Sequence, residues 1–261
     1  MQLTTTTSAV RVRVPAKVNL HLGVGALRGD GFHELHTVYQ AVDLYDEVLA
    51  SPAAGLEISV TGPEAAGVPE DAHNLAWRAA SLLADHAQVA PHVRLEITKA
   101  IPAAGGLAGG SADAAAALIA CAELWRTGTS RAELADLSAK LGSDVAFCIA
   151  GGSALGTGRG EIVAPVLSTG TFWWVLAFAD FGIATPDAYR ELDRQRGTTG
   201  GTLRAADTLL DALRAGDTEA LARSVSNDLQ PAALALRPSL RKTLATGRDL
   251  GALTCLVSGS G

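Results

Sequence analysis

The sequence has few of the features that define several common classes of protein. Its 3 cysteines are odd in number and lie far apart within apolar runs: Cys121, Cys148 and Cys255. This pattern predicts neither a disulfide framework nor a zinc site, but buried thiols in a reducing compartment. Apolar runs such as residues 114–122 and 172–179 are too short to span a bilayer. Residues 1–9 lack the basic segment and apolar core of a secretory signal. We therefore expect a cytoplasmic protein with no membrane partner.

Basic charge is also scarce. The chain has 21 lysines and arginines against 27 aspartates and glutamates, which gives a formal charge of −6. This balance, without a basic aromatic surface, disfavours a nucleic-acid partner, so an anionic ligand would have to be held by a local site. The length of 261 residues and the hydrophobic fraction of 48% predict an ordered globular protein of one large or two modest domains.

Residues 101–113 form a glycine-rich stretch. Four of its residues are glycine, between a strand-like run that ends at Pro102 and an alanine-rich run over residues 112–124. A glycine loop that leads into a helix can wrap backbone N–H groups around a phosphate. It can equally let a helix pack close against a sheet. The spacing matches neither the P-loop nor the dinucleotide-binding fingerprint, so both interpretations remain open at this point.

A strand is predicted near the N-terminus. Every even position of residues 10–24 is apolar, which is the period of a half-buried strand, with a possible break at Pro15. Lys17, Asn19 and His21 then project from the opposite face. Such a face is usually solvated, but a lysine and an asparagine among small and apolar residues can also line a site.

Other elements follow from local patterns. Strands are expected over residues 33–42, 56–61, 93–97, 172–179 (buried) and 252–257, and a hairpin over residues 151–161. Helices are expected over residues 72–86, 112–124, 130–141, 186–194, 203–214, 217–228 and 238–250. Ser130 and Glu133 form a predicted capping box, and Gly142 ends that helix. Residues 196–202 are interpreted as a linker, and the composition changes near residues 165–170.

Several polar residues have two possible roles. Ser111 can be a helix N-cap or a ligand to phosphate or metal. Asp113 is expected to stabilise the first turn of its helix, and Asp144 can be an N-cap. His33 and His36 lack an acid or cysteine at metal-ligand spacing, so we reject a metal pair.

Three motifs together resemble the superfamily of galactokinase, homoserine kinase, mevalonate kinase and phosphomevalonate kinase, the GHMP kinases. They are residues 15–20 (PAKVNL), residues 101–112 (IPAAGGLAGGSA), and residues 141–145 (LGSDV) with 156–161 (GTGRGE). More narrowly, the chain resembles members that phosphorylate a cytidine-diphosphate-linked methylerythritol in non-mevalonate isoprenoid synthesis. Residues 29–35 (GDGFHEL), 74–76 (NLA) and 227–229 (NDL) support this.

The resemblance implies ATP as co-substrate, with Mg²⁺, and a catalytic pair. Asp144 matches the family's base, and Lys17 its partner lysine, which would keep Asp144 ionised and favour the developing alkoxide. Asn74 and Lys99 match positions near the nucleotide, and Ser111 is the candidate Mg²⁺ ligand. The family's phosphate-binding loop corresponds to Pro102, Ala103, Ala104, Gly105, Gly106, Leu107, Ala108, Gly109, Gly110, Ser111 and Ala112.

The resemblance also implies how the acceptor is recognised. Phe32 or Tyr189 would stack on the cytosine, and His33 would offer hydrogen bonds to its edge. Asn19 would lie beside the reactive alcohol. The alternatives are a kinase of another small alcohol, which residues 29–35 disfavour, and a nucleotide-binding sensor without catalysis, which the retention of Lys17 and Asp144 disfavours.

The implied fold is a two-domain α/β (α+β) kinase with its site between the domains. Residues 1–165 would form the ATP-binding domain and residues 166–261 a ferredoxin-like domain, in a monomer or weak homodimer. Ala104 and Ala108 replace glycines that many relatives carry, which predicts a slightly stiffer loop that still donates its N–H groups where φ is negative. Residues 256–261 resemble the start of the family's third motif, after which relatives continue, so a protein ending at Gly261 is expected to be poorly stable and weakly active.

Overall fold

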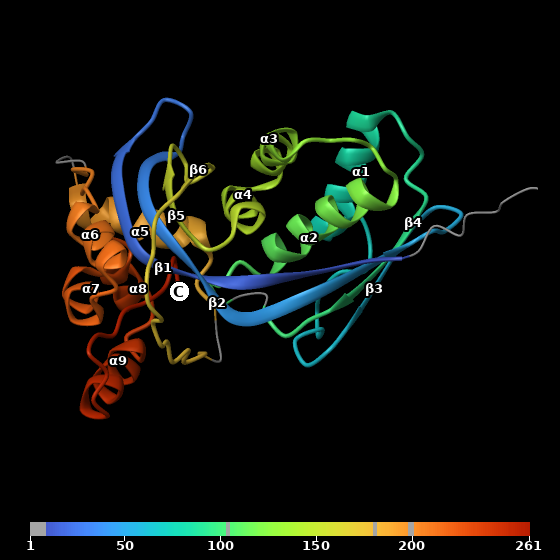
Figure 1. The fold of residues 1–261 in the computed structure, drawn as a ribbon. Helices are drawn as coiled ribbons and strands as arrows, with labels where there is room; N and C mark the ends of the chain where they lie inside the picture. The colour runs from blue at the N-terminus through green and yellow to red at the C-terminus, as the bar shows by residue number, and fades with distance from the viewer. Residues whose placement is uncertain (1–8, 103–104, 180–181, 198–200) are drawn as a thin grey trace, which may run out of the picture. The chain divides into compact units, whose positions relative to one another are not determined.

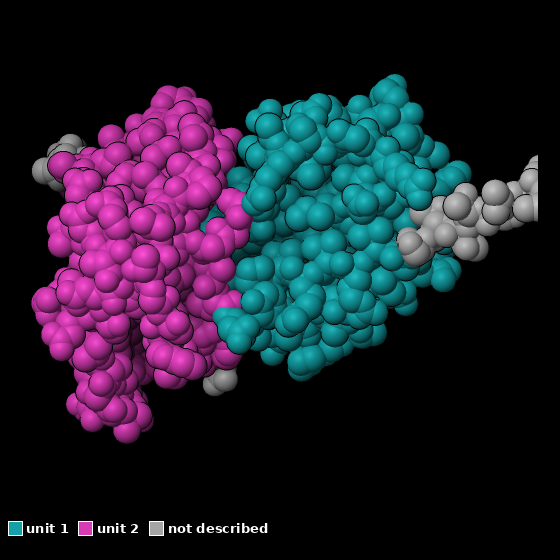
Figure 2. All heavy atoms as spheres, viewed as in Figure 1, with its two compact units in different colours: residues 1–16, 43–103, 108–149 teal, residues 17–42, 104–107, 150–261 magenta. Residues whose placement is uncertain are grey.

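The computed structural model of the protein describes residues 9–102, 105–179, 182–197 and 201–261. These form two compact units, and Figure 2 shows them in two colours. Unit 1 takes in residues up to 16, 43–103 and 108–149, and unit 2 takes in residues 17–42, 104–107 and 150–261. The units are thus interleaved along the chain, whereas the division expected at residue 165 was linear; that boundary stays a prediction.

Two long strands contribute to both units (Figure 1). They are β1 (Val10–Leu27) and β2 (His33–Ser51). The sheet has the order β3-β4-β2-β1-β7, with β5 paired to β2 and β6 to β5. The shorter strands are β3 (Leu56–Thr61), β4 (Val93–Thr98), β5 (Ser153–Thr157), β6 (Ile162–Pro165) and β7 (Ser226–Asn227). The strand predicted from the alternation of apolar residues is confirmed, and its even positions from Val14 to Val24 are buried. Pro15 does not interrupt the strand.

Unit 1 is a sheet portion covered by helices. β3 (Leu56–Thr61) pairs in parallel with β4 (Val93–Thr98), and β4 pairs antiparallel with the end of β2, with Glu47 opposite Thr98. The helices are α1 (Leu75–Ala87), α2 (Gly109–Leu124), α3 (Arg131–Leu141) and α4 (Ser143–Ala150). α2 packs against α1 and α3, and its alanines are buried on several sides, as in a core helix. The capping box of Ser130 and Glu133 is confirmed.

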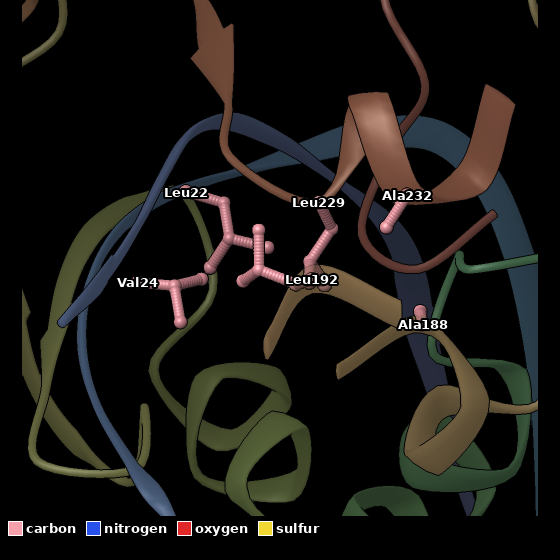
Figure 3. Close-up of a cluster of buried hydrophobic side chains, with 6 residues drawn as sticks. All are labelled: Leu22, Val24, Ala188, Leu192, Leu229 and Ala232. Atoms are coloured by element: carbon pink, nitrogen blue, oxygen red, sulfur yellow. The ribbon is translucent and has the colours of Figure 1, made fainter. Parts of the chain in front are cut away.

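Unit 2 begins with the remaining halves of β1 and β2. β7 (Ser226–Asn227) pairs in parallel with β1, and β5 (Ser153–Thr157) pairs antiparallel with β2 and with β6 (Ile162–Pro165), which confirms the hairpin. The helices are α5 (Thr185–Arg196), α6 (Asp207–Ala215), α7 (Thr218–Ser224), α8 (Gln230–Leu236) and α9 (Leu240–Asp249). Figure 3 shows a buried cluster in which β1, α5 and the start of α8 meet: Leu22, Val24, Ala188, Leu192, Leu229 and Ala232.

Two predicted strands are wrong. Residues 172–179 are neither paired nor buried, since Trp173 is 91% and Val175 98% exposed. Residues 252–257 are also not in a strand. An apolar run indicates only that a segment suits a sheet; a strand needs a hydrogen-bonded neighbour, which the run itself does not supply. The helix expected over residues 217–228 is also too long, because the chain leaves α7 at Ser224 to pair as β7. Within the described ranges, no helix is long and apolar enough to cross a membrane.

Candidate active site

The glycine-rich stretch enters α2 through a strained residue. Ala108 precedes Gly109, the first residue of α2, and has φ of 62°, in the left-handed region. The condition of a negative φ is not met at Ala108, because the turn into the helix requires the opposite sign. Alanine has no side-chain oxygen with which to cap the first N–H groups of α2, and these remain available to an anion.

One expectation about the start of α2 is corrected. Ser111 lies inside the helix and is not its N-cap, since Ala108 holds that position. Ser111 is half-buried. Ala103 and Ala104 were predicted to bind phosphate and lie outside the described residues. Pro102 and residues 105–112 are described, and their role as a phosphate loop stays a prediction.

Asp113 does more than stabilise a helix turn. It lies beyond the first turn of α2 and is buried together with Lys99 and Asp46. Lys99 Nζ donates to Asp113 Oδ2 at 2.8 Å and also to Asp46 Oδ2. Burial raises the pKa of Asp113 to about 7, against the attraction of Lys99 and with further repulsion from Asp46. Asp46 gave no signal in the sequence, because it is 53 residues from Lys99.

Asn74 has a clear structural role. Its side chain accepts the Ala76 N–H at 2.8 Å, which caps α1, and its Nδ2 donates to the Pro69 carbonyl at 2.7 Å. Asp144 lies in the first turn of α4 and is half-buried. The N-cap alternative for Asp144 is therefore wrong, while a carboxylate in a first turn is favoured by the helix dipole. Both residues belong to unit 1.

Lys17 and Asn19 form an ordered pair in unit 2. Lys17 Nζ donates to Asn19 Oδ1 at 2.7 Å, and Asn19 Nδ2 donates to Thr37 Oγ1 at 2.9 Å. Thr37 Oγ1 in turn donates to the His21 carbonyl at 2.8 Å. All four residues are buried, which rules out the interpretation of this face as solvated. Thr37 was not predicted, because only the pairing of β1 with β2 brings it to Asn19.

The glycine loop and the C-terminal glycines reach this same pair. The Lys17 N–H donates to the Leu107 carbonyl at 3.2 Å, and the Asn19 N–H donates to Ser258 Oγ at 3.2 Å. Gly106, with φ of +65°, lies so close to Ser258 that a Cβ there would be 2.7 Å from its carbonyl oxygen. A Cβ on Gly259 would be 3.7 Å from Lys17 Nζ. Unit 2 thus gathers parts of the glycine loop and of the C-terminal glycine segment around one buried ammonium.

The NDL motif, residues 227–229, holds the C-terminal glycine segment in place. Asn227 Nδ2 donates to the carbonyls of Val257 and Gly259, each at 2.7 Å. Asp228 accepts the Val24 N–H at 3.0 Å and pairs with Arg196 at 2.9 Å. Arg196 was assigned to a linker, but it belongs to α5 and anchors the end of β1.

The residues expected to recognise cytidine are also in unit 2. His33 stacks on Tyr189, with ring centroids 5.3 Å apart. Its Nδ1 donates to the Gly25 carbonyl at 2.9 Å, and its Nε2 lies 3.3 Å from Asp193 Oδ2. The ring of Phe32 remains 52% exposed, with the Arg159 guanidinium 4.8 Å from its centroid. Arg159 and Asp193 are neighbours of this group that the sequence did not single out.

Two further histidines lie close to the Lys17 segment. Burial lowers the pKa of His21, whose ring nitrogens lie 2.8 Å from Ser226 Oγ and 3.1 Å from the Arg204 carbonyl. His36 meets the His21 ring edge-on, with centroids 5.9 Å apart. In the part of the chain that the structure describes, no group of three His, Cys, Asp or Glu side chains could hold a metal ion.

Two protein-family models match the chain. The model of the GHMP kinase N-terminal domain matches residues 74–152, and that of the C-terminal domain matches residues 209–261. The chain belongs to the GHMP kinase family and is an ATP-dependent small-molecule kinase. The two-domain fold class expected from the motifs is thereby confirmed.

Within this family, the chain is similar to proteins named 4-diphosphocytidyl-2-C-methyl-D-erythritol kinase. The one from Salinispora tropica is 58% identical over 255 residues, which cover 97% of this chain and 81% of that protein. The one from Streptomyces avermitilis is 58% identical over 254 residues, covering 97% of this chain and 86% of that protein. The crystal structure of a 4-(cytidine 5'-diphospho)-2C-methyl-D-erythritol kinase superposes with a TM-score of 0.78 at 34% identity, covering 97% of this chain and 87% of the other. A homoserine kinase from Cytophaga hutchinsonii shares the fold, with a TM-score of 0.70 at 22% identity, covering 100% and 84% of the two chains.

Proposed function

We propose that the protein transfers the γ-phosphoryl group of ATP to the 2-hydroxyl of 4-diphosphocytidyl-2-C-methyl-D-erythritol, in the cytoplasm. The observation that carries this proposal is the 58% identity to kinases of that name over 97% of the chain. The buried Lys17–Asn19 pair, bordered by glycine-loop residues, supports it, because phosphoryl transfer depends on positioned charge more than on covalent chemistry.

In this proposal the reaction is a direct transfer. The hydroxyl oxygen of the acceptor attacks the γ-phosphorus, the bond to the β,γ-bridging oxygen breaks, and ADP leaves. Asp144 accepts the proton of the hydroxyl, and the Lys17 ammonium stabilises the developing negative charge. Asn19 orients Lys17 through the 2.7 Å hydrogen bond between their side chains.

The phosphates of ATP are assigned to Pro102, residues 105–112 and the open N-terminus of α2. We propose that Mg²⁺ accompanies the phosphates, where it would neutralise their charge, and that the half-buried Ser111 hydroxyl is one of its ligands. Asn74 and Lys99 support this region from within unit 1.

The cytosine is assigned to the aromatic group in unit 2. The exposed ring of Phe32 is suited to stacking on a flat base, and Tyr189 backs His33. His33 would offer its Nε2 edge to the base in place of Asp193, since Nδ1 is held by the Gly25 carbonyl.

Release of ADP from Mg-ATP with each candidate alcohol tests the proposal. We expect turnover with the cytidine-linked alcohol and only background with homoserine or mevalonate. Turnover with another alcohol alone would contradict the proposed substrate. Nucleotide binding without turnover on any alcohol would favour a sensor instead.

A further inference from the structure

Both flanks of the glycine-rich loop are tied to one buried group of charges. Asp46 lies in β2. Its Oδ1 accepts the N–H groups of Ala100 and Ile101, at 2.7 and 2.9 Å. These residues lead into the loop. Asp46 Oδ2 accepts from Lys99, and Lys99 also donates to Asp113, on the helix that leaves the loop. All of these residues belong to unit 1.

The lysine also lies directly against the start of the helix. A Cβ added at Gly109 would be 3.2 Å from Lys99 Nζ and 3.1 Å from the carbonyl oxygens of Ile101 and Pro102. The Lys99 backbone is fixed in turn, because its N–H donates to the Thr61 carbonyl at 2.7 Å. The separation between residue 101 and Gly109 is therefore set by close contacts on both sides.

We propose that Asp46, Lys99 and Asp113 are positioning residues of the nucleotide site, which hold the two flanks of the glycine loop at the separation that ATP phosphates require. This inference rests on the proposed function, because it assigns ATP to that loop. It adds a set of buried residues that act on the nucleotide only through the backbone they hold.

Asp46 is suited to this task only as a carboxylate. One of its oxygens faces two backbone N–H groups and the other faces an ammonium, so both must accept. An asparagine would place its NH₂ group against donors in either orientation. Asp46→Asn therefore releases either the entry to the loop or Lys99, while it changes the side-chain volume very little.

Asp113 differs because one of its oxygens is spare. Lys99 donates to Oδ2, while Oδ1 is buried and has no hydrogen-bond partner among the residues the structure describes. Asp113→Asn can thus keep the contact with Lys99 and lose only the charge.

The test measures binding of Mg-ADP by titration calorimetry, without any acceptor alcohol, together with steady-state kinetics. For Asp46→Asn we expect the Kd for Mg-ADP and the KM for ATP to rise about tenfold or more, the scale of a lost charge-assisted hydrogen bond. The KM for the alcohol should change less than about twofold, since the proposed function assigns the alcohol to Asn19 and the aromatic group of unit 2 and not to the loop flanks. Asp136→Asn, an exposed acid on α3, is the matched control.

Asp113→Ala and Asp113→Asn supply a second readout, the affinity for Mg-ADP at one pH. Asp113→Ala removes the contact between Lys99 and α2, whereas Asp113→Asn keeps an oxygen that can accept from Lys99. We expect the Kd for Mg-ADP to rise about tenfold for the alanine variant and less for the asparagine variant.

The proposal is overturned if folded Asp46→Asn binds Mg-ADP normally, or if its loss falls equally on ATP and the alcohol. Should Asp46→Asn not fold, equal affinities of Asp113→Ala and the unmodified protein for Mg-ADP would overturn it. Failure of the unmodified protein to bind Mg-ADP would contradict the proposed function itself, and turnover on an unexpected alcohol would leave this inference intact.

Discussion

Replacement of Thr37 by valine tests whether the chain of hydrogen bonds behind Lys17 matters for catalysis. Thr37 is 0% exposed, and its hydroxyl both accepts from Asn19 Nδ2 at 2.9 Å and donates to the His21 carbonyl at 2.8 Å. Valine has nearly the same shape, so the change removes the hydroxyl without creating a cavity. Asn19 then loses the acceptor that fixes its amide, and Lys17 loses a fixed partner.

The expected cost follows from these two contacts. Leaving a buried polar group without a partner costs about 1–3 kcal/mol, so the loss of both contacts in Thr37→Val should cost roughly 2–6 kcal/mol of stability. At about 2 °C per kcal/mol for a chain of this size, that corresponds to a fall in Tm of roughly 4–12 °C. If the amide of Asn19 reorients, kcat should fall about tenfold to a hundredfold, while the Kd for Mg-ADP stays close to normal.

Thr37→Ser is the matched control for this experiment. It keeps the hydroxyl and loses one buried methyl group, at a cost of about 1 kcal/mol. We expect nearly normal kcat for serine and a large loss for valine, measured by ADP release well below the Tm of each variant. Equal kcat values for the valine and serine variants would refute the reasoning.

Two further predictions concern the start of α2. Ala108→Gly should raise the free energy of unfolding by up to about 1 kcal/mol, because glycine tolerates the φ of 62° that alanine adopts there; a loss of stability in urea unfolding would contradict the left-handed assignment. Asp113→Asn should remove a pH dependence of stability. Because burial raises the pKa of Asp113 from 3.8 to about 7, the folded protein holds a proton that the unfolded chain releases within that window. The free energy of unfolding of the unmodified protein should therefore fall, relative to the variant, by up to about 4 kcal/mol as the pH rises from 4 to 7, and then level off. A constant difference across that range, in urea titrations at each pH, would show that Asp113 is not perturbed.

Local features of this fold could be predicted from the sequence because local physics determines them. The alternation over residues 10–24 gave β1, and Ser130 with Glu133 gave the start of α3. The failures have a different origin. Residues 172–179 have the composition of a buried strand, yet Trp173 and Val175 are exposed. The prediction failed because composition does not show whether a segment has a neighbouring strand to pair with.

The same distinction applies to the candidate site. Each glycine motif could be recognised because its residues are contiguous in the sequence, and the same holds for the motif that contains Lys17 and Asn19. Thr37 and Asp46 could not be recognised, since each meets its partner only through the fold. Ser258 belongs to a recognised motif, but its contact with Asn19 joins residues 239 positions apart and could not be predicted either. The strain at Ala108 was also missed, because the sign of φ at that residue depends on where α2 begins.

The most direct test of the account compares the unmodified protein with Asp144→Asn, using Mg-ATP and the cytidine-linked alcohol. The variant keeps the size of the side chain at the start of α4 and removes its ability to accept a proton. We predict that kcat falls about a hundredfold or more, while the Kd for Mg-ADP is unchanged. An unaltered kcat would contradict the assignment of Asp144 as the base and leave it as a charge that stabilises its helix.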